Sequence, residues 1–245
     1  MHALSHETLL FLIAHILGDY HLQSEKISER KNSTVERLRH VGIHLMLMFP
    51  ISLWMHVKGY PVQGWLLWIL LGASHYLFDA LISQLRKSKS DETLYLLDQV
   101  AHVALVVLLC ELLFHTPLQS PLSSEQLRWI LLFVLITKPA NVTFKKLFRR
   151  YQLVPRSANP IHVRETVETE PGAGALIGNL ERVLSAIFLS VGQYGAIGLI
   201  YTAKSIARFK QIEENRRFAE YYLIGTLYSI LYVVLVYFIL IVGVI

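Results

Sequence analysis

The sequence predicts an all-α membrane protein, a polytopic helical bundle with about six spanning helices plus a helical hairpin broken at residues 192–195. Three observations predict this fold. Hydrophobic residues make up 53% of the 245 residues and only 17% are charged, whereas about a quarter are charged in a typical soluble domain. The mean hydropathy is +0.44. Long apolar runs alternate with short charged patches, which is typical of helices of about 20 residues that cross a bilayer.

The first five apolar runs predict the helices of an N-terminal half, residues 1–137. Four of them cover residues 4–22, 41–57, 63–85 and 93–114. A short turn at residues 58–61, Lys-Gly-Tyr-Pro, separates the second run from the third. The fifth run, residues 126–136, is interrupted by Lys138 and Pro139. This five-helix half is predicted to bind the metal described below.

The remainder of the chain predicts two further parts. Residues 138–174 form a basic cytoplasmic segment and loop, and residues 175–245 form a C-terminal half. The apolar stretch 175–201 is broken by Gly192-Gln193-Tyr194-Gly195, which favours a hairpin over one crossing. A hairpin keeps the basic segment 203–220 on the same side as the other basic loops. That segment is predicted as one basic helix, and residues 221–245 as the last spanning helix.

The distribution of charge predicts the orientation. Loops 24–39, 86–91 and 138–170 are basic, while loops 58–62 and 115–125 contain one lysine between them. The positive-inside rule then places the N-terminus outside and the basic loops in the cytoplasm. The net charge of +5 arises from the same loops, so it does not indicate a nucleic-acid partner. The single cysteine, Cys110, allows neither a disulfide framework nor a cysteine-based zinc site.

Four pairs of histidine and aspartate residues on the first four predicted helices are the most informative feature. The members of each pair are four residues apart, which places both side chains on one face of a helix. The pairs are His15 with Asp19, His40 with His44, His75 with Asp79, and Asp98 with His102. A rise of about 1.5 Å per residue places them in one layer, roughly 5 to 15 Å deep in the cytoplasmic half of the bilayer. His40 is expected at the membrane edge, within reach of water.

Such a layer predicts a metal site, because ionisable groups inside a membrane are costly and usually face a functional interior. Imidazole and carboxylate groups without a thiolate suit a divalent transition metal, with zinc the first choice and Mn, Fe or Ni the others. Eight side chains are enough for one or two ions, or for one ion whose ligands are oriented by the remainder. A hydrogen-bond or proton-relay network and a haem held by facing histidines are the alternatives.

Charged residues in the C-terminal half predict an anionic substrate. Glu181 and Arg182 lie about two turns into the first arm of the hairpin, and Lys204 and Arg208 lie at the end of its second arm. The hairpin topology returns all four to the His/Asp layer. We expect Glu181 and Arg182 to be catalytic, and Lys204 and Arg208 to bind a phosphate-bearing substrate. A simple Glu–Arg ion pair and snorkelling of the other two basic side chains are the plainer interpretations.

Several of these motifs together resemble a bacterial membrane family catalogued as domain of unknown function 3307. They are His15-Ile-Leu-Gly-Asp19-Tyr-His-Leu-Gln23, His75-Tyr-Leu-Phe-Asp79, Asp98-Gln99-Val-Ala-His102, Gly178-Asn-Leu-Glu181-Arg182 and Lys204-Ser-Ile-Ala-Arg208-Phe. The resemblance implies a location in the bacterial inner membrane and no particular activity. The HxxxD pairs are also similar, more loosely, to those of membrane-bound metal-dependent hydrolases.

The sequence therefore favours a membrane-embedded metal-dependent enzyme, a hydrolase acting on a lipid-like or phosphate-bearing substrate at the cytoplasmic leaflet. The predicted partners are the lipid bilayer and such an anionic substrate, and the oligomeric state is left open. A divalent-metal or proton-coupled transporter is one alternative, because charged residues at mid-depth also line ion pathways. A non-enzymatic sensor or partner-binding subunit, docking through residues 151–174 and 203–220, is the other.

Overall fold

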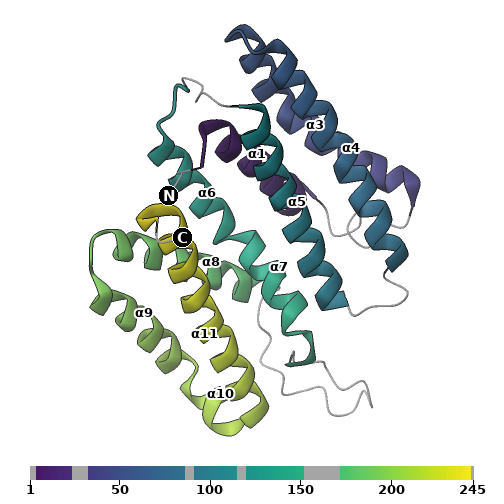
Figure 1. Cartoon of the computed structure of the whole chain (residues 1–245). Coiled ribbons are helices and arrows are strands. Elements are labelled where there is room, and N and C mark those ends of the chain that lie inside the picture. Colours follow the sequence, from purple (N-terminus) through teal and green to yellow (C-terminus); the bar gives the residue numbers. More distant parts are fainter. Residues whose placement is uncertain (1–3, 24–32, 86–90, 115–119, 152–171, 244–245) are drawn as a thin grey trace. The chain divides into compact units, whose positions relative to one another are not determined.

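The computed structural model describes residues 4–23, 33–85, 91–114, 120–151 and 172–243, and every regular element within those ranges is a helix (Figure 1). Five of these helices are long and apolar enough to cross a membrane: α3 (Thr34–Val57), α4 (Pro61–Leu85), α5 (Asp91–Leu113), α8 (Ala173–Ser190) and α11 (Arg216–Tyr237) with its continuation η4 (Phe238–Val242). Helices α6 (Ser124–Leu135) and α7 (Lys138–Leu147) form a sixth if they are counted as one bent span. The predicted polytopic all-α fold is confirmed.

The outer faces of these helices are apolar. Met46 is 78% exposed, Leu77 63% and Leu199 70%, and they are three of many large hydrophobic side chains left uncovered. A soluble protein rarely leaves contiguous apolar surface on this scale in contact with water. Exposure on this scale is compatible with lipid chains covering these faces.

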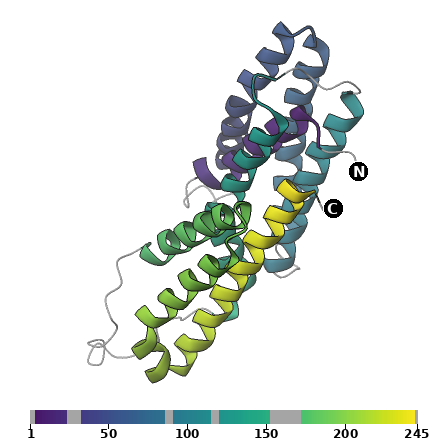
Figure 2. The same ribbon diagram turned by 90° about the vertical axis from the view of Figure 1, so that its left-hand side faces the viewer.

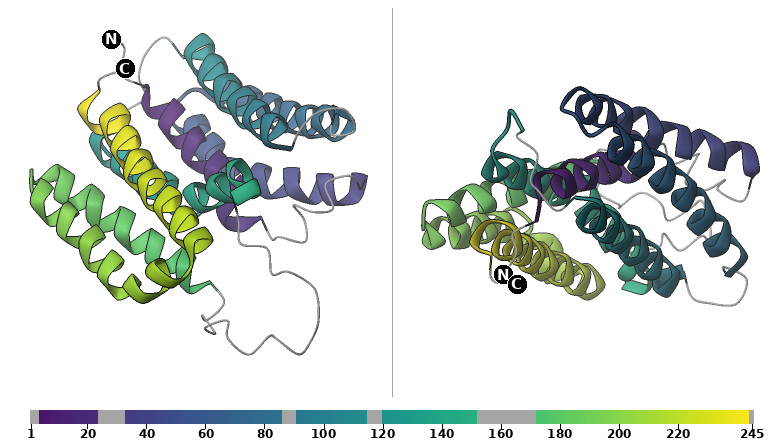
Figure 3. Two further views of the ribbon diagram at one scale, coloured as in Figure 1. Left: turned by 90° about the horizontal axis from the view of Figure 1, so that it is seen from below. Right: turned by 45° about the horizontal axis from the view of Figure 1, so that its top comes forward.

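The chain divides into two compact units, and the first comprises Met1–Leu135 together with Gly243–Ile245. In this unit α1 (His6–Ile16) continues into the π-helix η1 (Leu17–Leu22). Ser5 begins α1 by accepting a hydrogen bond from the backbone N–H of Thr8. Helix α1 packs against α3, α5 and α6, while α3 and α4 form a long antiparallel pair (Figures 1 and 3). The residues of the four predicted pairs all belong to this unit.

The second unit comprises Ile136–Val242. It contains α7, the short 3₁₀ turn η2 (Arg149–Tyr151), α8, α9 (Tyr194–Ala207), α10 (Phe209–Glu214), α11 and η4. Helix α8 packs against α9 and α11, as Figure 2 shows. The predicted hairpin is confirmed as α8 and α9. Its turn contains Gly192 at a φ of +69°, a conformation that glycine adopts without the steric penalty of a side chain.

Two predicted helix boundaries are wrong. The second helix begins at Thr34 rather than residue 41, because the polar residues 34–40 continue the helix beyond the apolar run. The segment 203–220 is not one helix, since it is divided among α9, α10 and α11. Asn215 ends α10 in an extended conformation, and its side chain accepts a hydrogen bond from the backbone N–H of Phe218 to begin α11.

The division into parts 1–137, 138–174 and 175–245 stays a prediction. The basic loop at 24–32 and residues 152–171 of the cytoplasmic loop lie outside the described residues.

Candidate metal centre

The eight residues of the four predicted pairs are linked by close contacts in the interior of the first unit. Asp19 is provided by η1, His15 by α1, His40 and His44 by α3, His75 and Asp79 by α4, and Asp98 and His102 by α5. Contacts join them across helices as well as within each pair: the rings of His75 and His102 lie 4.2 Å apart between centroids, and those of His15 and His102 lie 5.3 Å apart. The structure therefore brings side chains from four helices into contact, while their position in one layer of the membrane stays a prediction.

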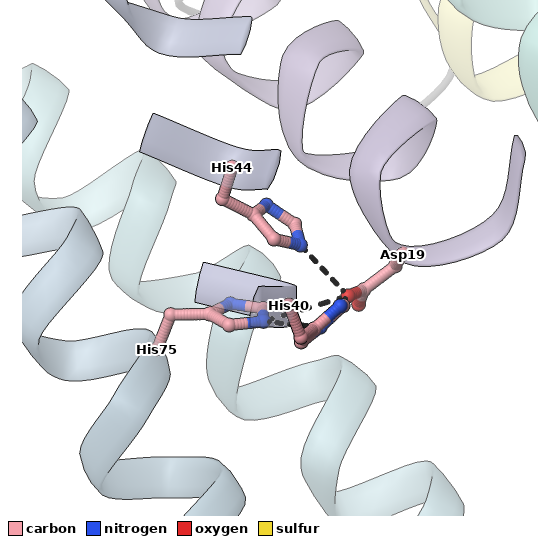
Figure 4. A group of neighbouring side chains, drawn as sticks. All are labelled: Asp19, His40, His44 and His75. Atoms are coloured by element: carbon pink, nitrogen blue, oxygen red, sulfur yellow. Dashed lines mark hydrogen bonds and ion pairs between the residues drawn. The ribbon is translucent and has the colours of Figure 1, made fainter. Parts of the chain in front are cut away.

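Asp19, His40, His44 and His75 form the tightest group (Figure 4). The Oδ1 atom of Asp19 lies 3.1 Å from Nε2 of His40, 3.1 Å from Nε2 of His44 and 3.5 Å from Nε2 of His75. Nε2 of His40 and Nε2 of His75 are 2.8 Å apart. Figure 4 shows the three rings pointing toward the carboxylate from α3 and α4. Each side chain offers one ligand atom within 4.8 Å of all the others.

This convergence fits a metal ion better than a network of hydrogen bonds. A neutral imidazole has one N–H, and its other ring nitrogen only accepts. Three Nε2 atoms converge on one oxygen, and two of them also face each other at 2.8 Å, so neutral rings lack the protons to bond every contact. Ligands bound about 2.0–2.1 Å from a tetrahedral zinc ion lie roughly 3.3 Å apart. The four separations given above, 2.8 to 3.5 Å, bracket that value, and all six distances among the four ligand atoms lie within 4.8 Å.

A second group comprises His75, Asp79 and His102. Nδ1 of His102 donates a hydrogen bond to the backbone carbonyl oxygen of Asp98 at 2.8 Å and lies 3.3 Å from Oδ1 of the same residue. Because a carbonyl oxygen can only accept, this bond places the proton of a neutral His102 on Nδ1. Nε2 of His102 is then a lone pair, and it is buried with no hydrogen-bond partner among the described residues. A histidine oriented in this way is typical of a metal ligand.

The other oxygen of Asp19 is held by residues that the spacing of the pairs did not indicate. Nε2 of Gln99 donates a hydrogen bond to Oδ2 of Asp19 at 3.2 Å. The hydroxyl of Tyr20 donates to Oε1 of Gln99 at 2.8 Å and lies 2.7 Å from the hydroxyl of Tyr95. This chain of hydrogen bonds directs Oδ2 toward α5 and leaves Oδ1 facing the three histidines. Gln99 belongs to the quoted Asp98-Gln99-Val-Ala-His102 motif, but no role was predicted for it.

The close approach of η1 and α3 depends on Gly18. A Cβ atom on this residue would lie 2.5 Å from Cε1 of His44, well inside the contact distance of two carbon atoms. A π-helical turn shifts the side chains that follow it and is frequent at functional sites. The π-helical turn of η1 carries Asp19, and Gly18 leaves room for the ring of His44 beside it.

The expected contact of His40 with water is wrong, while the ligand roles predicted for His15 and Asp98 stay predictions. The side chain of His40 is fully buried, because α3 begins before it. His15 and Asp98 are in neither group of converging ligand atoms. Nε2 of His15 lies 3.4 Å from Oδ2 of Asp19, and Asp98 holds His102 as described above. Both residues therefore lie beside a ligand group, in positions from which they can orient a ligand.

The charged residues predicted in the C-terminal half lie in the second unit. Nζ of Lys204 donates to Oε2 of Glu181 at 2.7 Å, so Glu181 is paired with Lys204 rather than with its neighbour Arg182. Arg182 donates to neutral oxygens instead. Arg208 donates to Oε1 of Gln211 at 3.1 Å. The predicted approach of these residues to the His/Asp layer, and their catalytic and substrate-binding roles, stay predictions.

The fold and the cluster define a helical membrane protein with a buried group of histidine and aspartate residues that could hold a metal ion. The family model described as "Protein of unknown function (DUF3307)" matches residues 8–131. The chain belongs to this family. The matched residues contain all four His/Asp pairs, whereas the motifs around Glu181 and Arg208 lie beyond them. No curated protein and no solved structure matches the chain.

Proposed function

We propose that the first unit binds one divalent transition-metal ion inside the membrane, through Asp19, His40, His44 and His75. The convergence of three Nε2 atoms and one carboxylate oxygen supports this proposal more than any other observation. A neutral imidazole has a single lone pair, and His75 belongs to both groups of ligand atoms. We therefore propose one ion at a time rather than two separate sites, with Asp79 and His102 adjoining it. Zinc is the first candidate, because it takes nitrogen and oxygen ligands from histidine and carboxylate groups and can expand from four to five ligands to admit water or substrate.

We further propose that the centre hydrolyses a phosphate-bearing, lipid-like substrate. A bound divalent ion polarises a phosphoryl oxygen and lowers the pKa of bound water. In this proposal the three histidines and Asp19 hold the ion, and Gln99 orients Asp19. Asp79 is the proposed general base, because its Oδ2 atom lies 3.8 Å from Nε2 of His40, beside the ligands. A carboxylate in that position can accept a proton from an attacking water molecule.

Metal analysis of the purified full-length protein tests the first part. We expect about one transition-metal ion per chain, and a loss of most of it when His44 and His75 are both replaced by alanine, because two of the four ligands are removed. His56→Ala is a matched control, since this exposed histidine lies at the end of α3 and accepts a hydrogen bond from Trp65. Metal that is absent from the wild type, or that survives the double substitution, would reject the site.

Hydrolysis is tested separately, with metal-loaded protein in lipid nanodiscs. We expect release of inorganic phosphate from phosphatidic acid, and its loss in Asp79→Asn. A protein that retains its ion and releases no phosphate would reject the hydrolase and leave the metal site standing. Uptake of the same ion into proteoliposomes would instead support the transporter.

A further inference from the structure

The second unit contains a cavity that the metal centre does not use. Its volume is about 360 Å³, and α7, α8, α9 and α11 line it. The lining residues come from α7, from the first half of α8 up to Arg182, from the end of α9 with the adjoining Arg208, and from α11 between Phe218 and Ser229. The cavity therefore reaches from helix ends beside charged segments, where the headgroup region of a bilayer is expected, toward the middle of α8 and α11.

Among the described residues, the cavity is lined by four basic side chains and no acidic one: Lys145, Arg182, Lys204 and Arg208. One carboxylate compensates part of this charge, since Glu181 forms an ion pair with Lys204 at 2.7 Å. Within the part of the chain that the structure describes, the positive charges of Arg182, Lys204 and Arg208 against the one negative charge of Glu181 leave an excess at the cavity. Such an excess in a site of low dielectric constant attracts an anion more strongly than it would in water.

Arg182 is the most informative of the four, because its side chain is buried and forms no ion pair among the described residues. Its nitrogen atoms donate to neutral oxygens only: the backbone carbonyls of Ile136 and Thr137, Oδ1 of Asn141 at 2.7 Å, Oδ1 of Asn179 at 2.9 Å and Oγ of Ser229 at 3.1 Å. These bonds fix the guanidinium at the cavity wall without neutralising its charge. A buried charge is costly unless it is paired, so an anionic ligand would complete this arrangement.

The other walls of the cavity are aromatic. Phe144, Phe218, Tyr221, Tyr222 and Tyr228 line it. The guanidinium of Arg208 lies 6.0 Å from the ring centre of Phe218, and Nζ of Lys204 lies 5.4 Å from that of Tyr222. Basic groups held against aromatic rings suit a ligand that has an anionic head and an apolar body.

We propose that this cavity binds a phosphate monoester carried by a membrane lipid, with the phosphate at Arg182, Lys204 and Arg208 and the apolar portion against the aromatic walls. Phosphate is favoured over a single carboxylate because three basic side chains line the cavity and a phosphate monoester offers more charge and more acceptor oxygens. Arg208 can present paired N–H donors to these oxygens, whereas Arg182, whose N–H groups are largely taken by neutral oxygens, contributes mainly its charge. Binding is inferred from the second unit alone. Only the further idea that this lipid is the substrate rests on the proposed function.

Titration calorimetry of the full-length protein in detergent tests the proposal, with dihexanoyl phosphatidic acid as the probe. We expect one binding site per chain. Dihexanoyl phosphatidylcholine and inorganic phosphate should each bind at least about tenfold more weakly, the first because its phosphate is a diester that carries a cation and the second because it has no apolar body. Equal binding of inorganic phosphate would overturn the lipid as the ligand, and equal binding of phosphatidylcholine would overturn the phosphate monoester.

Two matched substitutions localise the site. Arg208→Gln should weaken binding of the phosphatidic acid by about tenfold or more, since it removes a charge-assisted hydrogen bond. Lys210→Gln should leave binding within about twofold, because Lys210 is in the same basic segment but its nearest ionic partner is Glu214 at 3.9 Å, outside the cavity. If both substitutions weakened binding equally, the lipid would be attracted by net charge alone, and this result would overturn the site. The His44→Ala, His75→Ala variant should bind the lipid normally, which separates this proposal from the metal centre.

Discussion

Asp19 shows how far individual residues were predictable. The four-residue spacing indicated which side chains share a helix face, and the contacts between them follow that spacing. Spacing does not indicate which oxygen of a carboxylate faces which partner. Gln99 immediately follows Asp98, so its direction differs by about 100° around the helix, and no periodic pattern marks it as a member of the cluster. Its role depends on the packing of α5 against α1, which is a contact between distant parts of the chain.

Gln99→Leu should weaken metal binding without removing a ligand. The substitution keeps a similar volume but removes the amide that donates to Oδ2 of Asp19. Loss of a group that orients a ligand costs roughly 10- to 100-fold in metal affinity. Competition with a chromophoric chelator measures the change. Val100→Leu is the control, because Val100 is adjacent and 65% exposed; an affinity loss as large in this variant, or none in Gln99→Leu, would contradict the role of Gln99.

At the scale of elements, apolar runs located the helices but not their ends. The run of helix α3 begins at Val41, whereas the helix begins at Thr34 and so buries His40 on its inner face. Polar residues are free to continue a helix when their side chains face other protein groups, and hydropathy does not register this. The π-helical turn of η1 is equally invisible to a pattern of 3.6 residues per turn. The hairpin was predictable because glycine marked its turn.

Gly18→Ala should disturb the packing of η1 against α3. The added methyl group would lie 2.5 Å from the ring of His44, so either the ring or the turn must move. Overpacking of this kind costs about 1–3 kcal/mol, and it also displaces a proposed ligand. We expect a lower unfolding temperature by tryptophan fluorescence and reduced bound metal. Gly42→Ala on α3 is the control, since a Cβ there meets nothing within 4 Å; equal effects of the two would show that the close approach is not responsible.

At the scale of the whole molecule, the chain combines two units with different chemistry. The family model covers the first, with its His/Asp cluster, and ends before the second, with its basic cavity. The His/Asp residues and the charged residues of the C-terminal half could both be picked out from the sequence, because ionisable groups are conspicuous in apolar runs. It did not predict that Glu181 pairs with Lys204, since that contact depends on how the hairpin closes. The location in a bacterial inner membrane, which the family resemblance implied, and the N-terminus outside, which the charge of the loops indicated, stay predictions.

The number and direction of crossings can be determined from the accessibility of three exposed lysines. Lys58 and Lys146 are separated by α4, α5 and the α6–α7 pair. Three crossings place the two lysines on opposite sides of the membrane, and two crossings place them on the same side. Lys210 is separated from Lys146 by the hairpin of α8 and α9, which returns the chain to the side on which it began. The positive-inside rule assigns Lys146 and Lys210 to the cytoplasm.

We therefore expect a membrane-impermeant thiol reagent to label Lys58→Cys in right-side-out vesicles, and Lys146→Cys and Lys210→Cys in inverted vesicles only. Cys110 is buried, so labelling of the unsubstituted protein provides the background. Reversal of all three patterns would leave the fold intact and reject the orientation. Labelling of residues 58 and 146 from the same side would reject α6–α7 as a span. Labelling of residues 146 and 210 from opposite sides would mean that α8 crosses once, and the basic end of α9 would then face away from the cytoplasm.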